Sequence, residues 1–390
     1  MDNNVLMHLL LIKNIGPAVI EKLVKAVSDD EQGVFTKNIY EWQQSDFMRA
    51  GISAKVAILL VEGLACTALL DRELELCYEH DVKVVTLWDA EYPALLKNTH
   101  LPPPILYYKG NFSALCHEYA VALVGSRKAN LYGKRAVDLL VPDLVNVGVA
   151  TVSGGASGID TLVHEATLKT GGATVAVLGS GLLRPYPSEN TRLFERIAQE
   201  KGAVVSSFPL LMDALPGNFP ARNRIIAGLS QLCVVVQAAQ KSGALITAQY
   251  ALNEGRSVGA VPGPIDDELS YGGYTLLDAG ARLISSSHDI FEELSGISAG
   301  VSSKVQSEGL VVQEKQKTIY DHQLKLERAM SVSKPIIDED PVVQACRKAK
   351  GFEQLRVEIG LPDNELKDRL FMLQLEGKIE QDFAGLWRTV

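Results

Sequence analysis

Short apolar runs alternate with amphipathic segments along residues 119–295 of this chain. The strand-like runs lie at 120–124, 149–152, 174–178, 203–206, 232–236, 257–261 and 282–285. Between them, apolar residues recur at helical spacing at 132–147, 158–170, 190–201, 222–229, 243–255 and 272–280. This alternation predicts an α/β domain with a doubly wound, mostly parallel sheet of the extended Rossmann-like type, covered by helices on both faces.

Residues 1–85 are predicted to form a helical domain. Apolar residues recur at helical spacing on both sides of the Gly16-Pro17 pair and again on both sides of Gly51, after which a helix is expected from Ala54 to about Leu70. The pattern resembles paired helix-hairpin-helix (or SAM-like) units. Because no lysine directly follows either glycine turn, a packing role is favoured over contact with a DNA backbone.

Residues 86–118 are predicted to form an extended strap or linker between this helical domain and the α/β domain. The three prolines at 102–104 exclude a helix and favour a stiff extended chain. The apolar residues at 105–108 are then expected to form a strand that docks on the next domain.

The pattern changes again after the α/β domain. Residues 296–335 are rich in Ser, Gly, Gln and Lys, which predicts a flexible linker. Residues 336–390 predict a small winged-helix-like domain, with a turn at 360–366 between two helices and two strands within 379–388. The second of these helices carries no excess of basic residues, so contact with another protein is favoured over DNA reading.

The overall charge is acidic, with 47 acidic against 38 basic residues and a formal net charge of −9. Nucleic-acid-binding domains are usually basic, so a nucleic-acid site here needs a local basic cluster. The five cysteines show no CxxC spacing, which argues against a disulfide framework or a zinc site and fits a reducing cytoplasm. No apolar run is long enough to cross a bilayer, and the first residues lack the basic character of an export signal. We expect a cytoplasmic protein that binds neither a metal ion nor a membrane.

Glycine and basic residues gather where the predicted parallel strands end. The run SGGASG at 153–158 follows one strand and opens a helix, so its backbone amides are expected to approach an anion. The carboxyl ends of parallel strands share one edge of the sheet, and arginine grips phosphate with two hydrogen bonds. Loops that pair glycine N–H groups with Arg127, Lys128, Arg222, Arg224 and Lys241 are expected to form a rim suited to an anion.

An enzyme is the alternative class. Nucleotide phosphoribohydrolases carry a PGGxGT loop followed by a glutamate, whereas the loop at 262–270 reads PGPIDDELS. No GxGxxG motif follows the first strand, which argues against a dinucleotide oxidoreductase. His164 is expected to be packed rather than a catalytic base, Asp160 to stabilise a helix start, and Glu165 to face solvent. We therefore predict no catalytic residue.

Several long motifs occur in one order along residues 86–290. They read YP at 92–93, LPPPILYYKG at 101–110, GSR at 125–127, SGGASGID at 153–160, LGSG at 178–181, YPSEN at 186–190, FPARNRIIAGLS at 219–230, SGALITAQYAL at 242–252 and GRSVGAVPG at 255–263. Together they resemble the DNA-processing protein A family (DprA/Smf).

This resemblance implies a single-stranded DNA-binding protein that protects incoming or exposed strands and helps load the RecA recombinase, in recombination and natural transformation. It also implies a homodimer formed through the Rossmann-like domain, and no cofactor. The resemblance implies that a backbone phosphate binds with little preference for base sequence. Its pocket would be edged by Ser126, Arg127, Gly154, Gly155, Arg222, Asn223, Lys241, Ser242 and Gly243. Phe219 would either stack on a base or pack beneath its loop. Leu183 and Tyr274 depart from the family pattern, in which aspartate and asparagine are usual.

Overall fold

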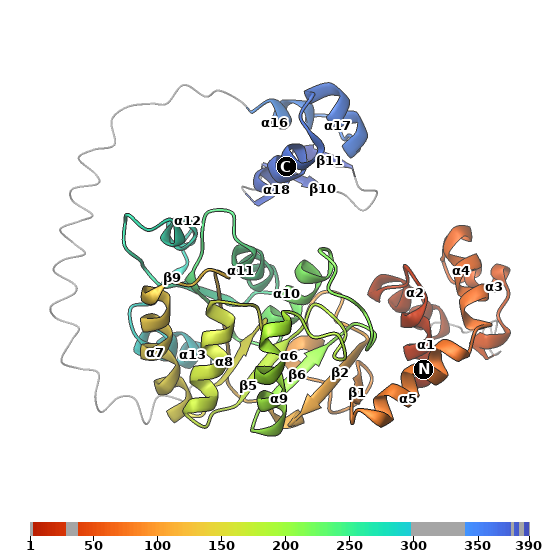
Figure 1. Cartoon of the computed structure of the whole chain (residues 1–390). Helices are drawn as coiled ribbons and strands as arrows, with labels where there is room; N and C mark the ends of the chain where they lie inside the picture. The colour runs from red at the N-terminus through yellow and green to blue at the C-terminus, as the bar shows by residue number, and fades with distance from the viewer. Residues whose placement is uncertain (1–2, 29–37, 298–339, 376–377, 382–385, 390) are drawn as a thin grey trace. The chain divides into compact units, whose positions relative to one another are not determined.

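The computed structural model describes residues 3–28, 38–297, 340–375, 378–381 and 386–389, and it contains two compact units, Met1–Ser307 and Glu308–Val390 (Figure 1). The first unit holds the N-terminal helices together with the α/β sheet. From residue 298 on, the linker predicted at 296–335 lies outside the described residues. The domain boundaries expected near residues 85, 118 and 335 stay predictions.

A nine-stranded sheet forms the centre of the first unit, in the order β1-β2-β6-β5-β4-β3-β7-β8-β9. Strands β3 to β9 pair in parallel, while β1 and β2 pair antiparallel at one edge. This confirms the predicted doubly wound, mostly parallel sheet, and the segment expected to dock as a strand is β2. The strands are Lys83–Thr86 (β1), Ile105–Gly110 (β2), Ala120–Gly125 (β3), Ala150–Ser153 (β4), Thr174–Val177 (β5), Ala203–Ser206 (β6), Leu232–Gln237 (β7), Ser257–Ala260 (β8) and Arg282–Leu283 (β9).

Helices cover both faces of the sheet, because successive residues of a strand point to opposite faces. Val121 and Leu123 of β3 pack in one apolar cluster with α7 and α8, whereas Ala122 and Val124 pack in another with α10 and α11. The helices of this part are Ala94–Lys97 (α6), Leu131–Asn146 (α7), Ile159–Lys169 (α8), Thr191–Gln199 (α9), Asn218–Gly228 (α10), Gly243–Asn253 (α11), Tyr271–Asp278 (α12) and Ser287–Ile297 (α13).

The strand order reverses between β3 and β7. From β3 the chain adds β4, β5 and β6 on one side, then returns to place β7 and β8 on the other. In open α/β sheets, ligands bind beyond the carboxyl ends of the strands at such a reversal. A binding site is therefore expected at the loops after β3 and β7.

One helix begins earlier than its apolar pattern predicts. Helix α10 begins at Asn218 rather than near residue 222, with Pro220 in its first turn. A proline is tolerated there because the first N–H groups of a helix have no partner within the helix. Phe219 and Arg222 are consequently carried on the first turns of a rigid helix instead of a loop.

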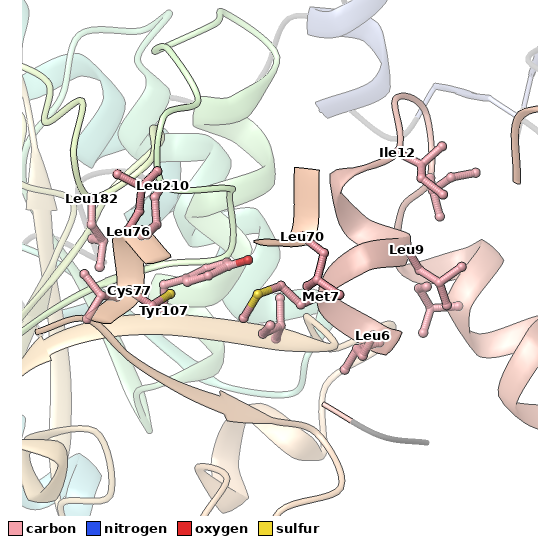
Figure 2. Close-up of a cluster of buried hydrophobic side chains, with 14 of the residues drawn as sticks. Leu6, Met7, Leu9, Ile12, Leu70, Leu76, Cys77, Tyr107, Leu182 and Leu210 are labelled. Carbon is pink, nitrogen blue, oxygen red and sulfur yellow. The ribbon is translucent and has the colours of Figure 1, made fainter. Parts of the chain in front are cut away.

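The N-terminal helices share an apolar cluster with the sheet, which we call the junction (Figure 2). Leu76 and Cys77 of α5 pack in it with Tyr107 of β2 and with Leu210. The helical run expected from residue 54 to about 70 is divided, because α4 ends at Leu64 and α5 begins at Ala68. The helices are Asn3–Leu11 (α1), Pro17–Ser28 (α2), Gln44–Arg49 (α3), Ala54–Leu64 (α4) and Ala68–Glu79 (α5).

The second unit has its own small apolar core. Leu355, Leu366, Leu370 and Ile379 are buried in it. Gly360 adopts φ +73 and ends α17, at the turn that the sequence predicted. Its elements are Pro341–Ala345 (α16), Phe352–Ile359 (α17), Asp363–Leu375 (α18) and the antiparallel pair Ile379–Gln381 (β10) and Trp387–Thr389 (β11). Its assignment as a winged helix stays a prediction.

Candidate functional site

A cavity of about 350 Å³ lies at the reversal of the strand order. The loops after β3 and β7 and the first turns of α10 and α11 enclose it. The structure brings most of the expected site residues together here, because its lining includes Ser126, Arg127, Phe219, Arg222, Asn223, Lys241, Ser242 and Gly243. We call it the switch-point cavity.

The loop after β3 is held in place by backbone contacts. Ser126 N donates to Gln237 O of β7 at 2.7 Å, and Ser126 O accepts from Ile159 N at 3.1 Å. Gln237 is buried, and its Nε2 donates to Asn130 Oδ1 at 2.9 Å, where Asn130 caps α7. The exposed Arg127 therefore projects from a fixed loop, while Lys128, also exposed, does not line the cavity.

The glycine-rich loop after β4 does not present its amides as we expected. Gly154 N and Ala156 N donate to Asp160 Oδ2, at 3.1 Å and 3.2 Å. Asp160 lies in the first turn of α8 and is 6% exposed. The expectation that this loop cradles an anion with these amides is wrong, because the chain's own carboxylate already occupies them. Asp160 stands in the first turn of α8, as expected, and its carboxylate binds two amides that precede the helix.

Gly154 instead makes room for an arginine. A Cβ on Gly154 would overlap Arg222 Nη1, so the guanidinium lies directly against the glycine. Gly155 does not line the cavity; a Cβ there would come within 2.6 Å of Phe194 Cε1. The absence of a side chain at 154 is thus what lets the Arg222 guanidinium lie over the glycine loop.

Arg222 is a buried cation that faces the cavity. It is 5% exposed, and its Nε has no hydrogen-bond partner among the described residues. Burial lowers the pKa of the Arg222 guanidinium to about 10; Asp160 opposes this shift and Arg127 adds to it. The guanidinium is still charged at neutral pH. A buried charged donor with unused hydrogen-bonding capacity favours an anion in the cavity.

His164 lies beneath the site and is packed, as predicted. It is fully buried, and its Nδ1 lies 2.7 Å from Thr174 Oγ1. Burial and the nearby Arg222 lower the pKa of the His164 imidazole to about 3, so the ring is neutral at physiological pH. Glu165 is exposed, which confirms that it faces solvent.

The start of α11 adds positive potential to the same cavity. Ser242 caps this helix and accepts from Ala244 N at 3.3 Å, and the exposed Lys241 precedes it. Asn223 Nδ2 donates to Gly243 O at 3.3 Å and so ties α10 to α11. A helix N-terminus attracts anions through its unpaired N–H groups and its dipole.

Arg224 is not brought to the cavity with the other arginines. Its guanidinium donates to the His100 carbonyl, and it does not line the cavity. Positions 222 and 224 are two residues apart on α10, and such residues point to different sides of a helix. The two arginines were grouped because both follow the same predicted strand, although the helix expected at 222–229 already contains both.

Sequence reasoning missed three residues that shape the site. Gln237 positions the loop after β3, as described above. Asn190 Nδ2 donates to Gly155 O at 2.9 Å and so holds the glycine loop from outside. The Tyr186 ring lies 5.7 Å from that of Phe219. The available signal was the YPSEN motif, which carries Tyr186 and Asn190 and which we used for the family resemblance alone.

The two departures from the family pattern do not line the cavity. Leu183 packs at the edge of the junction, and its N donates to Leu210 O at 3.0 Å. Tyr274 Oη donates to Gly263 O at 2.6 Å. Both side chains contribute to packing or local hydrogen bonding beside the site.

Two further properties concern the described part of the chain. No cluster of His, Cys, Asp or Glu in it is arranged to hold a metal ion. In the same residues, no helix combines the length and the apolar character needed to cross a bilayer.

The chain is similar to several known proteins. The family model of DNA recombination-mediator protein A matches residues 83–295. DNA processing protein DprA of Bacillus subtilis is 39% identical over 58% of this chain and 75% of its own length. Protein Smf of Escherichia coli is 43% identical over 52% of this chain and 54% of its own length.

Two solved structures resemble this one. The X-ray structure of DNA processing protein A from Streptococcus pneumoniae matches with a TM-score of 0.66 and 33% identity, over 75% of this chain and 98% of that one. The Helicobacter pylori protein, described for its unique single-stranded DNA binding mode, matches with a TM-score of 0.50 and 28% identity, over 55% of this chain and 97% of that one. The chain described here belongs to the DNA recombination-mediator protein A (DprA/Smf) family.

Proposed function

We propose that this chain binds single-stranded DNA by holding a backbone phosphate in the switch-point cavity. One observation carries the proposal: the buried Arg222 guanidinium lines the cavity, and no group in the described part of the chain accepts a hydrogen bond from its Nε. A phosphate offers the charge and the acceptor oxygens that such a group lacks. The similarity to the Helicobacter pylori protein supports the same ligand.

The cavity reconciles phosphate binding with the acidic overall charge. Arg127, Arg222, Lys241 and the start of α11 are all positive at one edge of a chain whose net charge is −9. A cleft lined by one sign of charge focuses the local field, so it attracts an anion whatever the net charge of the protein. Because phosphates are the same at every nucleotide, we expect little preference for base sequence.

The test is the salt dependence of binding to an oligonucleotide. Arg127→Ala is expected to weaken binding by roughly tenfold, through loss of one charge-assisted contact. It should also reduce the slope of log K against log salt by about 0.7 for that contact. The matched control is Arg196→Ala, because Arg196 is exposed in the last turn of α9, at the opposite end of the sheet. Equal binding by the parent and Arg127→Ala at several salt concentrations would refute the site.

We also propose that the protein acts as a homodimer through the α/β domain. Leu131 and Leu139 of α7 are 63% and 74% exposed, and Leu139 lines a second cavity with residues just after β9. Such exposed apolar surface is typical of an interface. Light scattering should give a dimer mass for the parent and a monomer mass for Leu139→Asp; an unchanged mass would place the interface elsewhere.

The proposed biological role is to protect incoming or exposed strands in the cytoplasm and to help load RecA onto them. Family membership supports this role, and RecA is its proposed partner. The measurement is the rate of RecA filament formation on an oligonucleotide covered by a single-strand-binding protein. The chain should accelerate it, and an unchanged rate would contradict the loading role.

We propose no enzymatic activity. His164 is neutral and buried, and Asp160 accepts two backbone hydrogen bonds, so neither is placed as a free catalytic base. Incubation with nucleoside monophosphates should release no free base. Steady release would instead favour the phosphoribohydrolase alternative.

A further inference from the structure

Two aromatic rings lie beside the switch-point cavity. Phe219 stands in the first turn of α10, and Tyr186 belongs to the loop between β5 and α9. Their ring centroids are 5.7 Å apart, with 61° between the ring planes. Such an edge-to-face arrangement is favourable for aromatic pairs, so each ring helps to fix the other.

The Phe219 ring is already engaged by its neighbours. The Arg127 guanidinium lies over the ring, with Cζ 5.0 Å from the centroid. Gly179 also lies against the ring, because a Cβ there would come 3.1 Å from Phe219 Cδ1. A base that stacked on the face under Arg127 would have to displace the guanidinium and lose its cation–π contact.

The Tyr186 ring is available to a ligand. Tyr186 is 46% exposed, although the loop that carries it is anchored before the ring, where Leu183 N donates to Leu210 O at 3.0 Å, and after it. Pro187 is buried, and Asn190 Nδ2 bonds Gly155 O of the glycine loop at 2.9 Å. An exposed ring on an anchored loop offers a stacking surface whose position is largely fixed before a ligand binds.

We propose that Tyr186 is the side chain on which a nucleobase stacks, and that Phe219 is a positioning residue that holds Arg127 and the Tyr186 ring. The ligand is a base of the strand whose phosphate lies in the switch-point cavity, so the inference rests on the proposed function. Aromatic stacking accepts every base, which agrees with binding that ignores sequence.

The experiment compares an ordinary oligonucleotide with one that contains abasic positions, which keep the phosphates and lack the bases. The parent should prefer the ordinary strand, and Tyr186→Ala should lower that preference by roughly tenfold, within the range for one base–aromatic stack. Tyr186→Ala should bind the abasic strand as the parent does, with the same salt slope. Tyr186→Phe should restore the preference, because it restores the ring.

Two controls separate the roles of the rings. Tyr78→Ala removes a tyrosine of α5 that is 92% exposed, and it should change nothing. Phe219→Ala should weaken binding to both strands and lower the salt slope, because Arg127 loses the ring beneath it. Thermal unfolding of each variant checks that it is folded.

Each remaining outcome has one meaning. If Tyr186→Ala keeps the full preference for the ordinary strand, the assignment of Tyr186 is wrong. If Phe219→Ala lowers the preference and leaves the salt slope unchanged, Phe219 is the stacking residue and the proposal is overturned. If the parent binds neither strand, the proposed function itself fails.

Discussion

The cavity and the junction each bury one carboxylate, to nearly the same extent. Asp160 beneath the cavity is 6% exposed, and Glu73 in the junction is 5% exposed. Both accept backbone hydrogen bonds: Asp160 accepts from two amides of the glycine loop, and Glu73 Oε1 accepts from Leu210 N at 2.8 Å. In both, burial raises the pKa of the carboxyl group and the backbone hydrogen bonds oppose the shift.

What differs is the charge beside each carboxylate. Arg222 lies near Asp160 and opposes the rise in its pKa, whereas Glu73 lies near Tyr107 and Cys77 of the apolar junction. In the junction, the Glu73 carboxylate ties α5 to the chain before α10, and no ion pair with a cation joins it within the described part of the chain. Beneath the cavity, the Asp160 carboxylate compensates the charge of Arg222, whose guanidinium also lines the cavity. The burial of a carboxylate does not by itself distinguish the two regions. The cavity is identified as a binding site because Arg222, the cation beside Asp160, keeps a hydrogen-bond donor, Nε, that the described residues do not use.

Removing the site carboxylate should have the largest effect. Asp160→Ala leaves the buried Arg222 charge uncompensated and two loop amides without their acceptor, so we expect a loss of about 3–5 kcal/mol in the free energy of unfolding. Urea denaturation measures it. Asp138→Ala is the control, because Asp138 is an exposed partner of Lys134 on α7 and should cost about 0–1 kcal/mol. Similar losses for both variants would contradict the role of Asp160 in compensating the buried Arg222 charge.

A methyl group on the glycine loop should have the next largest effect. Gly154→Ala forces the Arg222 guanidinium away from the loop, so we expect roughly tenfold weaker binding of single-stranded DNA and a loss of about 1–3 kcal/mol in stability. Gly16→Ala is the control, since nothing lies within 4 Å of a Cβ at that turn. Unchanged DNA binding by Gly154→Ala would show that the position of Arg222 does not matter.

The junction carboxylate should give the smallest effect, with a distinctive pH dependence. Burial raises the pKa of Glu73, so folding favours its protonated form and stability falls as pH rises from about 4.3, the value for an exposed glutamate, through the folded value. Glu73→Gln keeps an acceptor for Leu210 N and removes the charge. The stability of the variant relative to the parent should therefore grow as pH rises through this range. Denaturation curves at several pH values measure this difference, and a flat or opposite trend would contradict it.

Much of the fold could be predicted from the sequence, because strands buried on both faces leave continuous apolar runs and amphipathic helices leave their own period. The lining of the cavity by Arg127, Arg222 and Lys241 followed from the rule that parallel strands end at one edge. The exclusion of Arg224 was missed because the arginines were grouped by the strand that they follow, although residues two apart in the helix expected at 222–229 point to different sides. The role of Tyr186 did not follow from the sequence, because its loop meets Phe219 through the tertiary fold alone.

The part played by the glycine loop was also beyond the sequence. A glycine run at the start of a helix is typical of loops whose backbone amides bind an anion. Here Asp160 takes two of those amides, and the space above Gly154 holds a guanidinium. The sequence of this loop is compatible with amides that bind an external anion and with amides that bind Asp160. Only the position of the Asp160 carboxylate in the structure distinguishes the two arrangements.

The central claim is that Gly154 acts through Arg222 rather than by contacting the phosphate itself. A double-mutant cycle on single-stranded DNA affinity, with Gly154→Ala, Arg222→Gln and the double variant, tests it most directly. We predict that Gly154→Ala weakens binding in the parent and has no further effect once Arg222 is glutamine. Equal, additive losses in both backgrounds would show that the loop binds the strand independently of Arg222, and the account would be wrong.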